Sequence, residues 1–156
     1  MQSISAEARS SAPLGKVWAL LADTASWARW APFDEAELES EGLPEREGVG
    51  AVRRFRRRSR VTRELVVAFE PPRHFGYELL SGLPIRDYRA DVTLTNDDGG
   101  TAIRWESSFR GKFPVPGALV KPALRGFIQE TAESLARAAE HSASSSRPSG
   151  GAREGG

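Results

Sequence analysis

The fold is decided by residues 74–110, which read HFGYELLSGLPIRDYRADVTLTNDDGGTAIRWESSFR. Two turn signals, Gly82-Leu83-Pro84 and Asn96–Gly100, divide this stretch into three apolar-polar alternating segments. Short connections of this kind join antiparallel neighbours, because parallel strands need crossovers of about a dozen residues or more. The stretch therefore predicts an antiparallel meander with strands at 74–82, 86–96 and 101–110.

The pairing of these strands predicts which face of the sheet is buried. Facing residues of an antiparallel pair lie on the same side of the sheet. Pairing across the first turn sets Phe75 opposite Val92, and pairing across the second sets Val92 opposite Trp105. Both turns, considered independently, put the large apolar residues on one face. The other face is nearly all polar and consists of Glu78, Arg89, Asp91, Thr93, Arg104, Glu106 and Ser108.

The rest of the chain supplies further strands and two helical regions. Alternation and turn residues predict strands at 2–10, 35–41, 49–57 and 61–70. Two short helical segments between Pro13 and Pro32 predict an elbow after the first strand. The longest helix is predicted over 118–141, with one apolar face at 3.6-residue spacing, and Pro122 either starts or kinks it.

This amphipathic C-terminal helix is the natural cover for the apolar face of the sheet. One helix does not fill the concave side of a strongly curved sheet of six or seven strands, so we expect an apolar cavity between the two. The predicted fold is therefore α+β, of the helix-grip type: a curved antiparallel sheet wrapped around a long C-terminal helix, with a two-helix elbow after the first strand.

Composition limits the classes of protein to consider. The chain has 156 residues, of which 39% are hydrophobic and 28% charged, as in one soluble globular domain. We expect this domain to span 1–141 and a disordered tail to span 142–156, where the apolar residues are alanines. The chain has no cysteine and a net charge of +1. We expect neither a secretory leader nor a membrane span, and therefore a cytoplasmic protein that does not bind nucleic acid.

Five segments of the sequence resemble the START-like superfamily, specifically the polyketide cyclase/dehydrase and lipid-transport-like branch of the SRPBCC proteins. The resemblance covers about residues 2–140. The segments are 12–23 (APLGKVWALLAD), 27–32 (WARWAP), 48–53 (GVGAVR), 64–72 (ELVVAFEPP) and 100–105 (GTAIRW).

The resemblance implies a hydrophobic-ligand pocket on a shared fold and leaves the reaction open. Our leading hypothesis is the binding of a small hydrophobic molecule, such as a lipid, a polyketide or an aromatic metabolite. The second is an enzyme of the cyclase/dehydrase type that uses the same cavity. The third is a non-catalytic regulatory module that binds a protein partner. The chain is a monomer or a dimer under any of them.

Apolar and aromatic side chains on the predicted inner face are the candidates for lining the cavity. They are Trp30, Phe69, Tyr77, Tyr88, Val92, Trp105, Phe109, Leu124, Phe127 and Ile128. Candidate polar contacts are Arg53 and Arg63, for a ligand carboxylate, and Glu64, which would act as an acid or base if buried. No catalytic residue is assigned. We expect no cofactor and no metal, because the two histidines are far apart in sequence and thiolates are absent.

The arginine-rich run at 53–63 admits several interpretations. It spans a predicted hairpin, so its side chains divide between two faces and a turn. We interpret it as the charged, solvated edge of the sheet, with a site for an anionic group as the alternative and nucleic acid as the least favoured one.

Overall fold

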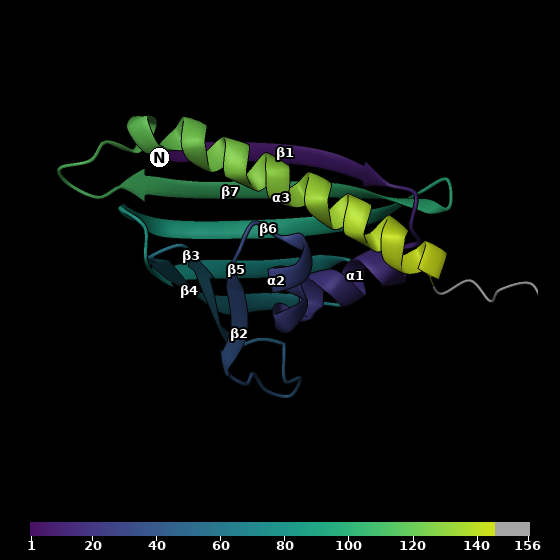
Figure 1. Ribbon diagram of the computed structural model, residues 1–156. Coiled ribbons are helices and arrows are strands. Elements are labelled where there is room, and N and C mark those ends of the chain that lie inside the picture. Colours follow the sequence, from purple (N-terminus) through teal and green to yellow (C-terminus); the bar gives the residue numbers. More distant parts are fainter. Residues whose placement is uncertain (146–156) are drawn as a thin grey trace, which may run out of the picture.

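A computed structural model describes residues 1–145 of the chain. Its centre is a seven-stranded antiparallel sheet of order β1-β7-β6-β5-β4-β3-β2, which curves about the long helix α3 (Figure 1). The strands are β1 (Gln2–Ser10), β2 (Glu35–Ser40), β3 (Val52–Arg57), β4 (Arg60–Glu70), β5 (His74–Ser81), β6 (Ile85–Asp97) and β7 (Gly100–Gly111). The helices are α1 (Leu14–Ala22), η1 (Thr24–Ser26), α2 (Trp27–Trp30) and α3 (Gly117–Ser145). The predicted fold class is confirmed.

The meander has the predicted register. Phe75 pairs with Val92, and Val92 pairs with Trp105. All three side chains are buried. An irregularity between Arg86 and Arg89 shifts the register near the start of β6. Tyr88, beside that irregularity, still lies on the buried side, so the apolar inner face continues past the irregularity to Ile85 at the start of β6.

Helix α3 crosses the concave face over β1 and β7, α1 contacts β6 and β7, and η1 and α2 lie near β2 (Figure 1). Helix α3 begins at Gly117, continues through Pro122 and is helical as far as Ser145, the last described residue, beyond the predicted end at 141. Leu135 and Ala139 are fully buried. The remainder of the predicted tail, 146–156, lies outside the described residues. No helix within residues 1–145 has the length and hydropathy that a membrane span requires.

The arginine-rich hairpin formed by β3 and β4 is not the edge of the sheet, which corrects the sequence interpretation. Strand β2 pairs with β3 and forms the edge instead. Glutamates on β2 face the outward arginines, so much of the local positive charge is compensated. The ion pairs are Arg54–Glu37 at 3.2 Å, Arg56–Glu35 at 3.0 Å and Arg63–Glu39 at 2.6 Å.

Candidate functional site

A buried ion pair crosses from β3 to β4 on the concave side of the sheet. Alternation along β3 turns Arg53 and Phe55 inward and Arg54 outward. Glu64 is the direct cross-strand partner of Arg53. The Arg53 Nη2 donates to Glu64 Oε1 at 2.8 Å, and the two side chains are 0% and 11% exposed. Such burial of a charged pair is uncommon, so this pair marks the interior as a candidate site.

Aromatic rings surround the guanidinium group. The Arg53 Cζ lies 4.4 Å from the ring centroid of Trp27, 4.7 Å from that of Phe75, 5.0 Å from that of Phe55 and 5.4 Å from that of Tyr77. Contacts of a cation with ring faces offset part of the cost of removing the charge from water. The cage holds the guanidinium group in one place under the helices.

The guanidinium group is not fully satisfied by the protein. Among residues 1–145, neither Arg53 Nε nor Arg53 Nη1 has a hydrogen-bond partner, and the buried Ser107 Oγ has none either. A buried donor without an acceptor costs about 1–3 kcal/mol, and more when it is charged. Native proteins rarely tolerate such groups unless a ligand, an ion or an ordered water completes them. The two Arg53 nitrogens therefore indicate where an acceptor oxygen would bind.

Two tyrosines extend this polar group along the inner face. The Trp105 Nε1 donates to the Tyr77 Oη at 3.1 Å, and the rings of Tyr77 and Tyr88 lie 6.1 Å apart between centroids. Burial raises the pKa of both tyrosine hydroxyls, so both stay protonated and can donate. Burial also raises the pKa of Glu64, although Arg53 opposes the shift. We call Arg53, Glu64, Tyr77, Tyr88 and Ser107 the polar cluster.

The structure buries the predicted lining residues to two degrees. The residues that are buried are Tyr77, Tyr88, Val92, Trp105, Phe109 and Ile128. Those that are half-buried and packed against this core are Trp30, Phe69, Leu124 and Phe127. Of the predicted polar contacts, Arg53 and Glu64 are brought together. Arg63 is not, because it lies opposite Arg54 on the outer face and binds Glu39 there.

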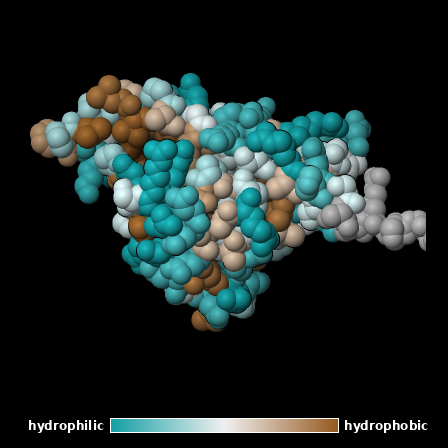
Figure 2. All heavy atoms as spheres, in the orientation of Figure 1, coloured by the Kyte–Doolittle hydropathy of each residue, from teal (hydrophilic) through white to brown (hydrophobic). Residues whose placement is uncertain are grey.

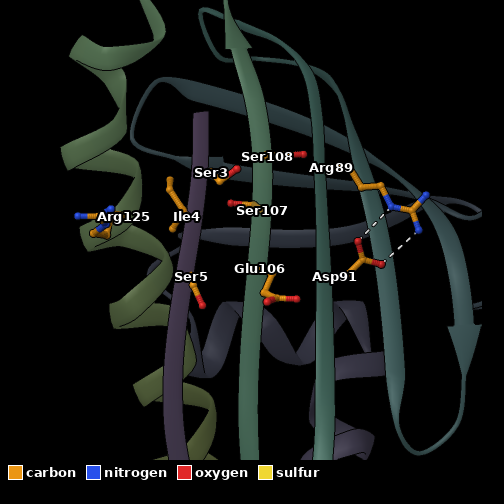
Figure 3. Close-up of a pocket in the computed structure, with 9 residues that line it drawn as sticks. All are labelled: Ser3, Ile4, Ser5, Arg89, Asp91, Glu106, Ser107, Ser108 and Arg125. Atoms are coloured by element: carbon orange, nitrogen blue, oxygen red, sulfur yellow. Dashed lines mark hydrogen bonds and ion pairs between the residues drawn. The ribbon is translucent and has the colours of Figure 1, made fainter. Parts of the chain in front are cut away.

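Two surface pockets lie outside the aromatic cage, and the first of them reaches Ser107 of the polar cluster. Figure 3 shows the first, which includes Arg89, Asp91 and Glu106 on the outer face of the sheet. The Arg89 Nε donates to the Asp91 Oδ2 there at 3.1 Å. The second pocket lies between the elbow and α3. Of the predicted lining residues, Trp30 alone borders it. The interior instead holds a continuous set of aromatic contacts, so the predicted cavity stays a prediction.

Several residues of the site were not among the residues predicted from the sequence. Ser107 could have been found, because strand parity puts it on the same side as Trp105. Phe75 was placed inward but not counted as lining. Trp27 had no such signal, since only the tertiary packing of the elbow brings its ring over Arg53. No group of three His, Asp or Glu side chains within residues 1–145 comes together in a way that could hold a metal ion.

Comparisons with known proteins agree with this architecture. The family model described as polyketide cyclase / dehydrase and lipid transport matches residues 1–140. No curated protein is significantly similar in sequence.

Solved structures share the fold at low sequence identity. The protein XoxI from Bacillus cereus superposes with a TM-score of 0.74 at 16% identity, over 88% of this chain and 95% of its own. A protein from Thermus thermophilus gives a TM-score of 0.69 at 17% identity, over 94% of this chain and 100% of its own. A START superfamily protein from Mycobacterium smegmatis gives a TM-score of 0.68 at 18% identity, over 92% of this chain and 97% of its own. The chain thus belongs to the polyketide cyclase/dehydrase and lipid transport family and has a START-like, helix-grip fold.

Proposed function

We propose that this protein binds a small, largely apolar molecule that carries an acceptor oxygen, between the concave face of the sheet and α3. The observation that carries the proposal is the buried Arg53, which has two guanidinium nitrogens without a partner among the described residues. A carbonyl, enolate or carboxylate oxygen of the ligand would accept from them. The tyrosine hydroxyls of the polar cluster would orient the same molecule.

The apolar walls around the cluster suit the remainder of such a ligand. Rings of Trp27, Phe75 and Trp105 surround the inner end of the site. An apolar ligand buried among them is favoured by about 25 cal/mol for each square ångström of apolar surface removed from water. An aromatic metabolite or polyketide, with ring faces and a few carbonyl oxygens, matches this combination better than a plain hydrocarbon.

A seam between the elbow and α3 offers a route to the interior. Phe33 and Phe127 are half-buried there, with ring centroids 5.5 Å apart, and the Phe33 ring stacks on Phe55 at 4.6 Å. Phe55 in turn contacts the guanidinium group of Arg53. Side-chain rotation of the two half-buried rings would connect the surface to the polar cluster.

Native mass spectrometry of the protein purified from its own host tests the proposal. We expect a bound molecule of defined mass that contains at least one carbonyl or carboxyl oxygen. The variant Arg53→Met/Glu64→Leu, which replaces the ion pair by apolar side chains of similar size, should fold and lose it. A folded double variant that retains the molecule at the native level contradicts the proposal.

The buried Glu64 favours a second candidate function, catalysis of the cyclase/dehydrase type on the same ligand. Burial raises the pKa of this carboxyl, which makes it a candidate general acid or base. Here it would act beside a carbonyl that Arg53 polarises. The variant Glu64→Gln keeps a hydrogen-bond acceptor for Arg53 but removes the titrating proton. Conversion of the bound molecule that stops in this variant while binding persists would support catalysis, and unchanged conversion would exclude Glu64 as the acid or base.

A further inference from the structure

An apolar projection with cationic flanks lies where β7 leads into α3. Phe113 in the connecting loop is 96% exposed, Leu119 in the first turns of α3 is 74% exposed, and Met1 is 74% exposed. Figure 2 shows the apolar surface gathered over this end of the molecule, at the upper left. We call Met1, Lys112, Phe113, Leu119 and Lys121 the tip.

The three exposed apolar side chains belong to one surface although they are far apart in sequence. The backbone of Gly117, at the start of α3, lies against the side chain of Gln2. The N-terminus therefore sits beside the beginning of α3 (Figure 1). Isolated exposed apolar residues need no explanation, but a cluster of large ones on one projection indicates an interaction surface.

The charge of the tip is of one sign. The segment 107–129 contains Arg110, Lys112, Lys121 and Arg125 and no acidic residue. Asp87 lies near Arg110, at 3.8 Å, but neither Lys112 nor Lys121 forms an ion pair with a residue in 1–145. The positive charge of the tip is thus largely uncompensated.

The first turns of α3 differ from an ordinary surface helix. Their outward face presents Ala118, Leu119, Pro122 and Ala123, all of which are exposed. A helix on the surface of a globular protein normally has polar residues on this side. Apolar residues that project between lysines are the pattern by which proteins bind the interface of a lipid bilayer.

We propose that the tip docks on the surface of an anionic lipid membrane, with Phe113 and Leu119 in the interface and Lys112 and Lys121 against the headgroups. The charge complementarity favours anionic lipid over a second copy of the chain, because two copies would bring like charges together. The proposal does not depend on what the polar cluster binds, since its test measures vesicle binding alone.

Co-sedimentation of the full chain with vesicles tests the proposal. We expect binding to phosphatidylcholine vesicles that contain phosphatidylglycerol, little binding to pure phosphatidylcholine, and weaker binding at high salt. Lys112→Gln/Lys121→Gln should weaken binding about 25-fold, because each lysine near an anionic surface contributes a factor of about five. Phe113→Ser should weaken it about tenfold through the loss of one inserted side chain.

Matched controls keep the test falsifiable. Leu43→Ser removes an 84% exposed apolar residue on the connection between β2 and β3, and Lys16→Gln removes a cation in α1. Both should bind vesicles like the native protein. Equal losses in controls and tip variants, or no binding by the folded native protein, would overturn the proposal. So would a dimer in sedimentation velocity that Phe113→Ser dissociates, because the tip would then be a contact between two copies.

Discussion

The two ends of the interior differ in whether their buried polar groups have hydrogen-bond partners. Where β1 and the second half of α3 meet, Ser10 Oγ donates to the carbonyl of Ala136 at 2.8 Å, and Thr101 Oγ1 donates to that of Ala12 at 2.9 Å. In the polar cluster, by contrast, Arg53 and Ser107 keep atoms without a partner among the described residues. We call these the closed end and the open end.

Under the proposed function, this difference separates a region that is only packed from one that binds a ligand. At the closed end, one buried hydroxyl links β1 to α3 and the other links β7 to the connection before α1, so both have a partner within the protein. At the open end, a charged group is surrounded by rings, and one carboxylate satisfies only part of its hydrogen-bonding capacity. Burying a charged group costs free energy because the group loses its hydration. A ligand oxygen that accepts from the unpaired guanidinium nitrogens would offset this cost.

Breaking the ion pair at the open end should have the largest effect on stability. Arg53→Met leaves the Glu64 carboxyl buried without its partner, which costs about 3–5 kcal/mol of unfolding free energy. Arg53→Met/Glu64→Leu should recover most of that loss, because it removes both charges. Urea denaturation measures both variants. A double variant as unstable as Arg53→Met would show that the site needs the charges for folding.

Truncation at the closed end should be costly for a different reason. Leu135 is fully buried, and Leu135→Ala should lower the unfolding free energy by about 2–5 kcal/mol through lost burial and a residual cavity. The selectivity for ligand at the open end should be unchanged. A loss of that selectivity in the folded variant would show that the two ends act as one site.

A change of pH sharpens the comparison, because Glu64 titrates at the open end. Burial raises its pKa in the folded chain above the unfolded value. The folded state therefore binds this proton more tightly, and the unfolding free energy falls as pH rises from the unfolded pKa through the folded one. Glu64→Gln lacks this titration. The native-minus-variant difference in unfolding free energy should decrease with pH over that window, and an increase would contradict the raised pKa.

Two buried serines provide the smallest and most closely matched comparison. Ser10→Ala at the closed end should cost about 1 kcal/mol, because a buried hydrogen bond to Ala136 is lost. Ser107→Ala at the open end should be neutral or slightly stabilising, because its hydroxyl is buried without a partner. Thermal denaturation compares the two variants. Equal losses would show that Ser107 is satisfied in solution.

Turn residues and alternation were sufficient to predict the fold. The glycines and prolines between the strands marked the connections. Because side chains alternate strictly between the two faces of a sheet, the pairing of the strands then gave the inner face of β5, β6 and β7. Parity also depends on the register of each hairpin. Between β3 and β4 the chain turns at Arg58, a non-glycine residue with a φ of 57° that no sequence pattern announces. The resulting register places Arg63 outside.

The polar cluster was only partly predictable. Alternation allowed Arg53 to face inward with Phe55, and Glu64 remained open because its side of the sheet depended on the same hairpin register. The aromatic cage depends on Trp27, which the elbow brings over β3 through tertiary packing. The family match could not identify the cluster either, since a shared fold serves many chemistries.

The affinity of the interior for a matched pair of compounds tests the central claim most directly. The ketone 1-tetralone and its hydrocarbon tetralin differ in one carbonyl oxygen. We predict that the native protein binds the ketone at least about tenfold more tightly, because a hydrogen bond from a charged group is worth about 1.5–3 kcal/mol. Folded Arg53→Met/Glu64→Leu should lose this preference. Equal affinities in the native protein, or a preference that survives in the variant, would contradict the claim that the buried guanidinium group recognises a ligand oxygen.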